Sequence, residues 1–322
     1  MRRLALVVVL LCAGCTATHG HIHVARQVPA TPSPSAVVPR HLVVRTMPWR
    51  LPGPIAREAV LPTSGVHLLV AGGLLPGDTS SATSYTLDLA TGHVRRGAPL
   101  PVPVHDTAAV SIRGRAVVVG GGNAAEQAAV QARSGSRWHV AGRLPSPRSD
   151  LAAVVVGGRA IVVGGYDGTT PALGEVLTSS DAVHWSRLGR LRVPVRYPGV
   201  AVLGRDIWVF GGERSGTEVR VVQRISPDGR VRVVGRLPTP LGHEAAAVLG
   251  HRILVAGGRT AADTLTARMW WFDPATRRFT AAGSLPHRLA DSGVAQERGA
   301  VWLVGGERPT FSAQVLKIAL TR

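Results

Sequence analysis

A pair of glycines recurs six times along this chain, and its spacing restricts the possible folds more than any other feature. The pairs begin at Gly72, Gly120, Gly164, Gly211, Gly257 and Gly305, so they return at a nearly constant interval. A leucine precedes each pair at a fixed offset, which is one position longer in the first copy: Leu51, Leu100, Leu144, Leu191, Leu237 and Leu285. A period of about 40–50 residues indicates a solenoid or a propeller.

Each copy contains the pattern of a four-stranded unit. Three apolar residues directly before the glycines, such as Ile161–Val163, predict a strand buried on both faces. Small residues upstream, such as Ala152–Ala153, predict an innermost strand crowded around an axis. A third and a fourth strand follow, and the fourth often carries an aromatic residue (Trp138, Trp185, Phe279). We therefore expect an all-β, six-bladed β-propeller of four-stranded blades over residues 41–322.

These features resemble the kelch repeat, in which apolar residues precede a Gly-Gly pair and an aromatic pair follows. Met269–Thr280, MWWFDPATRRFT, is the copy most similar to its strand-turn-strand half. The resemblance extends over residues 41–320, although several fourth strands lack the aromatic residue and Tyr85 is the one clear third-strand tyrosine. It implies a binding face built from the loops after the glycine pairs and the loops that enter each first strand.

The two ends of the repeat region predict how the ring closes. The last copy ends after its third strand, Ala313–Leu320, whereas His41–Trp49 precedes the first complete copy and lies where a fourth strand belongs. We expect the amino-terminal strand to pair with the last blade, which would leave no open sheet edge there.

Residues 1–40 carry an export signal and a spacer. Residues 1–15, MRRLALVVVLLCAGC, have a basic start, an apolar run too short to span a bilayer, and small residues before Cys15, as in a signal peptide. The segment resembles a bacterial lipobox, which implies lipidation of Cys15 and anchoring at the extracytoplasmic face of the cell membrane. An ordinary secretory signal, giving a secreted protein, is the alternative. Residues 16–40 predict a disordered, His- and Pro-rich tether; metal binding by His19, His21 and His23 is its less favoured alternative.

Composition limits the chemistry. The net charge of +18 favours anionic partners, and export argues against nucleic acid. Both cysteines, Cys12 and Cys15, precede the repeats, so the propeller has no disulfide, thiolate metal site or cysteine nucleophile. A copper oxidase resembling galactose oxidase is excluded for the same reason. We expect no cofactor and no metal, and a monomer.

The candidate ligand-binding residues are charged and aromatic side chains in the two sets of loops. They are Arg148, Tyr166, Asp167, Arg196, Tyr197, Glu213, Arg214, His243, Arg259 and Arg308. Arginines near an axis can hold a carboxylate, phosphate or sulfate by bidentate hydrogen bonds, or can instead form structural ion pairs between blades. An anion site predicts that Arg148, Arg196, Arg259 and Arg308 converge on one open cavity.

These features favour an exported binding or interaction module at the cell envelope, with an anionic glycan, wall polymer or protein as partner. The alternative is a sugar mutarotase resembling bacterial N-acetylneuraminate epimerase, with an acid/base pair such as His243 and Glu244. No motif in the sequence selects the enzyme, and no catalytic residue is assigned. A purely structural envelope lipoprotein, with all face charges paired internally, is the third possibility.

Overall fold

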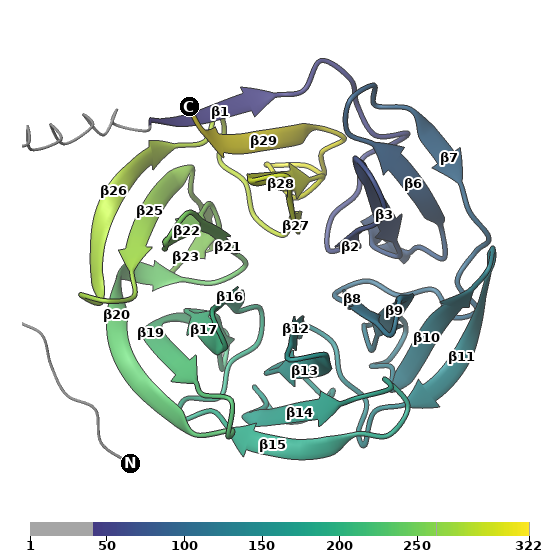
Figure 1. Cartoon of the computed structure of the whole chain (residues 1–322), viewed down its shortest axis with the longest axis horizontal. Helices are drawn as coiled ribbons and strands as arrows, with labels where there is room; N and C mark the ends of the chain where they lie inside the picture. Colours follow the sequence, from purple (N-terminus) through teal and green to yellow (C-terminus); the bar gives the residue numbers. More distant parts are fainter. Residues whose placement is uncertain (1–40, 262, 322) are drawn as a thin grey trace, which may run out of the picture. The chain divides into compact units, whose positions relative to one another are not determined.

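The computed structural model describes residues 41–321 except residue 262. These form six large antiparallel sheets arranged around an axis, together with two small two-stranded sheets (Figure 1). The six-bladed propeller predicted from the repeat is confirmed. The described residues contain no helix, so none of them forms a helix able to cross a membrane. The predictions for residues 1–40, including the signal peptide, Cys15, the tether and the three histidines, lie outside the described residues.

Small residues allow the innermost strands to approach the axis. These strands are β2 (Ala59–Pro62), β8 (Ala108–Ile112), β12 (Ala152–Val156), β16 (Gly199–Leu203), β21 (Ala245–Leu249) and β27 (Gly293–Glu297). Each begins with alanine or glycine, as the crowding around the axis predicts.

The second strands are the apolar runs that end at the glycine pairs. They are β3 (His67–Ala71), β9 (Arg115–Val119), β13 (Arg159–Val163), β17 (Asp206–Phe210), β22 (Arg252–Ala256) and β28 (Ala300–Val304). The last three residues of each are buried. Their side chains enter the cores on both sides of the blade, which explains why these strands show no alternation of polar and apolar residues.

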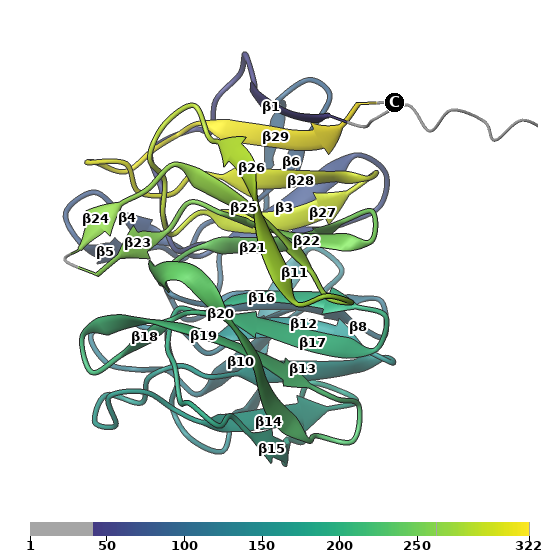
Figure 2. The ribbon, with the colours of Figure 1, turned by 90° about the vertical axis from the view of Figure 1, so that its left-hand side faces the viewer.

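The outer half of each blade is a hairpin. The third strands are β6 (Ser84–Asp88), β10 (Ala129–Ser134), β14 (Glu175–Ser179), β19 (Thr217–Ile225), β25 (Arg268–Asp273) and β29 (Val315–Leu320). The outermost strands are β7 (Val94–Arg96), β11 (Arg137–Arg143), β15 (Ser186–Arg190), β20 (Val231–Leu241), β26 (Arg278–Ser284) and β1 (Leu42–Thr46). Short strands β4 (Leu74–Leu75), β5 (Thr79–Ser80), β18 (Glu213–Arg214), β23 (Arg259–Thr260) and β24 (Thr264–Leu265) follow three of the glycine pairs on one side of the ring (Figure 2).

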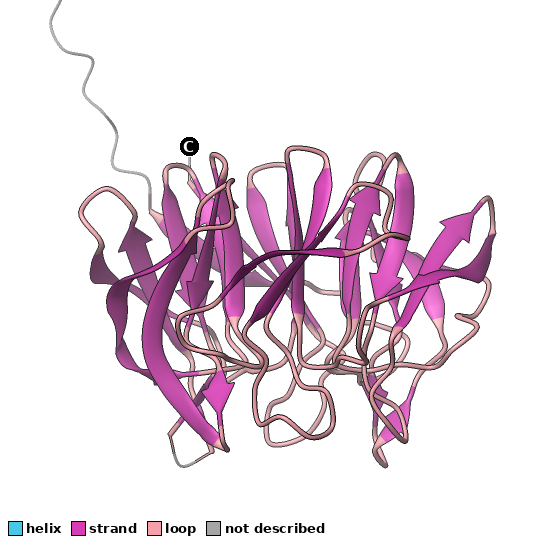
Figure 3. Ribbon diagram, turned by 90° about the horizontal axis from the view of Figure 1, so that it is seen from below, coloured by secondary structure: helices cyan, strands magenta, loops and turns pink. Residues whose placement is uncertain are grey.

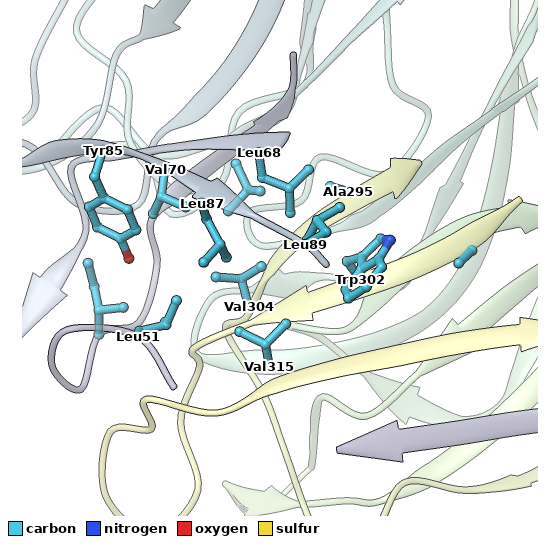
Figure 4. Close-up of a cluster of buried hydrophobic side chains, with 13 residues drawn as sticks. Leu51, Leu68, Val70, Tyr85, Leu87, Leu89, Ala295, Trp302, Val304 and Val315 are labelled. Carbon is cyan, nitrogen blue, oxygen red and sulfur yellow. The ribbon is translucent and has the colours of Figure 1, made fainter. Parts of the chain in front are cut away.

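The amino-terminal strand closes the ring as predicted. β1 pairs with β29 from Leu42↔Leu320 to Thr46↔Leu316, so the last blade is built from both ends of the repeat region. A shared apolar cluster joins this blade to the first one, where Leu68, Val70 and Leu87 pack toward Trp302 and Val304 (Figure 4).

The glycine pairs have a structural role between blades. All twelve glycines have positive φ. The second glycine of each pair donates its N–H to a carbonyl of the next blade, as Gly165 does to Val195 at 3.0 Å. A Cβ on the first glycine would lie 2.0–2.6 Å from that same carbonyl oxygen in all six copies. Only glycine fits this position, both for its φ and for the close backbone approach.

Candidate functional site

The two sets of loops predicted to form one face do lie together. Bridges of backbone hydrogen bonds join the loop before each first strand to the loop after its glycine pair, for example Ser149↔Tyr166 and Arg196↔Glu213. Figure 3 shows these loops gathered at the end of the ring away from the C-terminus. We call this end the axial face.

One residue of each blade contributes to a closed circle of backbone hydrogen bonds, the axial ring. Its members are Arg57, Asp106, Asp150, Tyr197, His243 and Asp291, with φ between 50° and 60°. Each N–H donates to the carbonyl of the ring member one blade earlier at 2.8–3.1 Å, and Arg57 N donates to Asp291 O to complete the circle. The left-handed conformation is costly for residues with a Cβ, although Asp tolerates it better than most. The closed circle of hydrogen bonds offsets that cost.

Side chains on the axial face, around the axial ring, form a network of ion pairs that joins neighbouring blades. Arg57 binds Asp106 at 3.2 Å and Glu307 at 2.8 Å. Arg196 pairs with Asp150 and Glu213, and Arg259 pairs with Asp291 and Glu307. We call these residues, together with His243, the axial network.

His243 lies at the centre of the axial network as a buried cation. Its Nδ1 lies 2.6 Å from Asp291 Oδ1, its Nε2 lies 3.6 Å from Glu213 Oε2, and its ring stacks on Tyr197. Burial opposes the charged form, but Asp291 and Glu213 outweigh burial and raise the pKa of His243 to about 10. Burial of Asp291 likewise opposes ionisation, yet His243, Arg57 and Arg259 lower its pKa to about 2. Burial and the neighbouring Asp106 raise the pKa of Asp150 to about 7.

The cations of the axial network are therefore all paired with carboxylates, which outnumber them. Its cations are Arg57, Arg196, Arg259 and the His243 imidazolium, and its carboxylates are Asp106, Asp150, Asp291, Glu213 and Glu307. Because every arginine already pairs with at least two carboxylates, none offers an unopposed positive charge to an anion. Of the two roles considered for the arginines, structural ion pairs between blades fit this geometry better than an anion site does.

Five of the ten predicted residues belong to this network or stack on it: Arg196, Tyr197, Glu213, His243 and Arg259. Tyr166 joins them, because the Arg196 guanidinium lies 5.1 Å from the centre of its ring. The other four residues are elsewhere. Asp167 caps its own loop through Thr169 and Thr170, Arg308 binds Gln314, and Arg214 is exposed on β18.

Arg148 departs furthest from the expectation. Its side chain is 0% exposed and donates to the carbonyl oxygens of Gly164 and Glu175 and to the Glu175 carboxylate. The equivalent positions of the other blades, two residues before the axial ring, are Ile55, Val104, Val195, Leu241 and Leu289, all apolar. Arg148 thus fills a core position, and the convergence of Arg148, Arg196, Arg259 and Arg308 on one cavity does not occur.

Five members of the network were not among the ten candidates: Arg57, Asp106, Asp150, Asp291 and Glu307. All five lie in the loops that the repeat points to. The ring members among them stand at the same offset before the first glycine of their blade, except that the offset of Arg57 is one position longer. That constant offset is the signal that could have identified the ring. Glu307 has no such signature, since its role depends on contacts across blades.

Behind the axial ring, a cavity of about 650 Å³ runs along the axis between all six innermost strands. A smaller hollow of about 120 Å³ lies on the side of the ring residues. The two share six lining residues, which we call the neck: Glu58, Thr107, Leu151, Pro198, Glu244 and Ser292.

Two buried carboxyl groups occupy the neck. Glu58 accepts the N–H of Gly293 at 3.3 Å and Glu244 accepts that of Gly199 at 3.2 Å, each from the preceding blade. These are the two first strands that begin with glycine. A Cβ on Gly293 would lie 2.2 Å from Val60 Cγ2 and 3.0 Å from Glu58 Oε1, and a Cβ on Gly199 would lie 2.9 Å from Glu244 Cγ. Burial raises the pKa of both carboxyl groups to about 8.

The neck gives a prediction for the pH dependence of stability. A carboxyl group whose pKa rises from 4.5 to about 8 on folding contributes its stability fully below pH 4.5 and loses it as the pH rises through 8. The natural chain should therefore lose stability as the pH rises from 5 to 9, whereas the double variant E58Q/E244Q should not lose this contribution. The melting temperature of the variant relative to that of the natural chain should rise over the same range. Thermal melts across that range measure the difference. The control E297Q alters a carboxylate on β27 outside the neck, and an equal gain in the control would contradict the assignment.

The fold places the chain in the class of six-bladed β-propellers. Among solved structures it is similar to that of YjhT, with a TM-score of 0.73 and 16% sequence identity over 85% of this chain and 99% of that chain. No protein-family model and no curated protein sequence matches the chain. At this identity the likeness concerns the fold alone.

Proposed function

We propose that this chain is an exported, lipid-anchored binding module that holds a saccharide unit of an envelope glycan on its axial face. The observation that carries the proposal is the axial network, in which arginine donors lie beside carboxylate acceptors around the axis. Arg57, Arg196 and Arg259 keep part of their side chains exposed, at 20%, 25% and 16%, beside the carboxylates of Glu213 and Glu307. The signal-like residues 1–15 support the location.

A polyhydroxylated ligand suits this array better than a free anion. A sugar hydroxyl both donates and accepts hydrogen bonds, so it can bridge an arginine N–H and a neighbouring carboxylate. A carboxylate or phosphate would have to displace the carboxylates that already pair with each arginine. The saccharide portion that meets the axial face is therefore uncharged.

Binding is favoured over the mutarotase alternative by the surroundings of its suggested acid/base pair. His243 has a side chain only 5% exposed and is held as an imidazolium between two carboxylates, which makes it a poor base near neutral pH. Glu244 extends into the neck and accepts the Gly199 N–H. Both side chains line the hollow of about 120 Å³, but His243 is already paired with Asp291 and Glu213, and Glu244 with the Gly199 N–H.

The test measures binding of neutral hexoses, N-acetylhexosamines and their short oligomers to residues 41–322, which contain the whole closed ring. Calorimetry should detect saturable binding without turnover. R196K and R259K keep the charge but lose the forked donor geometry, so each should weaken binding about tenfold, or about 1.4 kcal/mol. The matched control R214K, on the same face but outside the network, should bind as the natural chain does.

Two outcomes would contradict the proposal. One is the absence of saturable binding by any neutral saccharide in the panel. The other is measurable mutarotation of a free reducing sugar, followed by NMR of its anomeric protons, because turnover would favour the enzyme.

A further inference from the structure

The six outermost strands carry a uniform charge. Every one of them contains arginine, and none contains aspartate or glutamate. The arginines are Arg45, Arg95, Arg96, Arg137, Arg143, Arg187, Arg190, Arg232, Arg236 and Arg278, all exposed. Within the described part of the chain, none of these ten forms an ion pair. We call this surface the outer rim.

The acidic residues lie in other parts of the propeller. The carboxylates of the axial network and the neck lie near the axis, and others, such as Asp88, Asp181 and Asp273, cap the turns between strands. A bias toward arginine codons would account for the use of arginine in place of lysine. It does not explain why acidic residues are absent from all six outer strands.

Protection of sheet edges accounts for only part of the pattern. Charged side chains on an edge strand prevent edge-to-edge association, but lysine, glutamate and arginine all serve that purpose. The outer rim uses one sign in all six blades. A repeated positive charge points to a negatively charged partner.

The shape of the rim restricts the form of that partner. The outermost strands face outward around the whole circumference (Figure 1). A flat surface, such as a membrane, can touch only a part of this circumference at one time, whereas a flexible chain can follow several blades. Arginine guanidinium groups bind phosphate oxygens in a bidentate manner.

The outer strands also lack the aromatic platforms on which nucleic-acid bases stack. Their aromatic residues are Trp138, which is buried at 8% exposure, and Phe279, which is half-buried. Proteins that bind single-stranded nucleic acid combine a basic surface with aromatic side chains available for stacking. The rim offers the first of these features without the second.

We propose that the outer rim binds a flexible, linear, phosphate-bearing polymer without bases. The outer rim and the axial face are built from different residues. Polymer binding at the rim therefore does not depend on saccharide binding at the axial face. An envelope polymer that carries both sugars and phosphates would contact the two surfaces together.

The test uses long-chain inorganic polyphosphate as the probe and residues 41–322 as the protein. Binding, followed by fluorescence anisotropy of labelled polyphosphate, should weaken steeply as NaCl rises from about 50 to about 200 mM, with log K linear in log[NaCl]. The rim variant R187Q/R190Q/R232Q/R236Q removes four charges from two neighbouring blades. It should lose at least tenfold in affinity at about 100 mM NaCl and show a smaller salt slope.

The matched control R113Q/R205Q/R214Q/R288Q removes the same net charge from exposed arginines outside the outer rim. It should lose less than threefold. Melting temperatures establish that both variants fold; if the rim variant does not, R95Q/R96Q/R137Q/R143Q on the other side of the ring replaces it. R196K, which alters the axial face, should leave polyphosphate binding unchanged and so separates the two proposals.

Several results would overturn the inference. Equal losses in the rim variant and the control would show attraction to net charge only, and no binding even at the lowest salt concentration would exclude the rim as a polymer site. Tighter rim-dependent binding to oligothymidylate than to polyphosphate of equal charge would point to nucleic acid. Rim-dependent binding to phosphatidylglycerol vesicles without binding to polyphosphate would point to a membrane.

Discussion

Replacing Gly211 with alanine is expected to destabilise the propeller strongly, although the change adds only one methyl group. Gly211 has a φ of 45°, and a Cβ there would lie 2.0 Å from the carbonyl oxygen of Leu241 in the next blade. The atom in the way is backbone, so it cannot rotate aside as a side chain would. It also accepts the N–H of Gly212 at 2.9 Å, so moving it would weaken the bond between two blades.

The expected cost has two parts. The left-handed conformation costs an alanine about 1–2 kcal/mol, and forcing the blades apart adds about 1–3 kcal/mol. A loss of about 3 kcal/mol corresponds to a fall of about 5 °C in melting temperature for a domain of this size. Chemical denaturation and thermal melts of G211A measure both quantities.

Gly216 provides the matched control for this substitution. It has a φ of 76°, and a Cβ there would meet nothing within 4 Å. G216A should therefore show the conformational cost alone, about 1–2 kcal/mol. Equal losses in the two variants would mean that the contact with Leu241 carries no stability and that the glycine pair matters only for its φ.

The repeat determines the fold strongly because its signals are local. The glycines, the apolar run before them and the small residues of the first strand each satisfy a packing requirement that recurs in every blade. The missing fourth strand at the end of the chain and the spare strand at its start then allow one closure. For these reasons the number of blades, the strand order and the role of β1 could all be predicted from the sequence.

The candidate site was harder to predict because its side chains find their partners across blades. Arg259 and Glu307 lie in different blades, far apart in the sequence, and nothing in their neighbourhoods indicates that they pair. Arg148 illustrates the opposite error. It lies in the correct loop, but at a position that points into the core, where the other five blades place apolar residues. The loop was predictable, whereas the direction of one side chain within it was not.

The pairing of the axial arginines with carboxylates also changes how the net charge of +18 is interpreted. The axial arginines are matched by carboxylates, whereas the ten rim arginines are not. The attraction to anions expected from composition is therefore better assigned to the circumference of the ring than to its axis.

Removing residues 41–50 is the second change with a large expected effect, because it opens the ring. The deletion eliminates the pairing of β1 with β29 from Leu42 to Thr46 and the bond from Met47 N to Val315 O. It also removes Leu42 and Val44 from the cluster of the fifth and sixth blades, and Trp49 from the cluster that joins the first and sixth. The loss of a whole strand and its apolar contacts should lower the melting temperature by about 10 °C or more.

The opened blade should also associate. β29 would become an edge strand with free N–H and carbonyl groups, and its buried residues Val315 and Ile318 would lie at the new edge. Calorimetry measures the loss of stability, and size-exclusion chromatography at several concentrations measures association through the exposed edge. Deletion of residues 1–40 alone retains β1 and serves as the control. A synthetic peptide of residues 41–50 should restore part of the melting temperature by occupying the vacant edge, whereas an unchanged melt of the shortened chain would refute closure by β1.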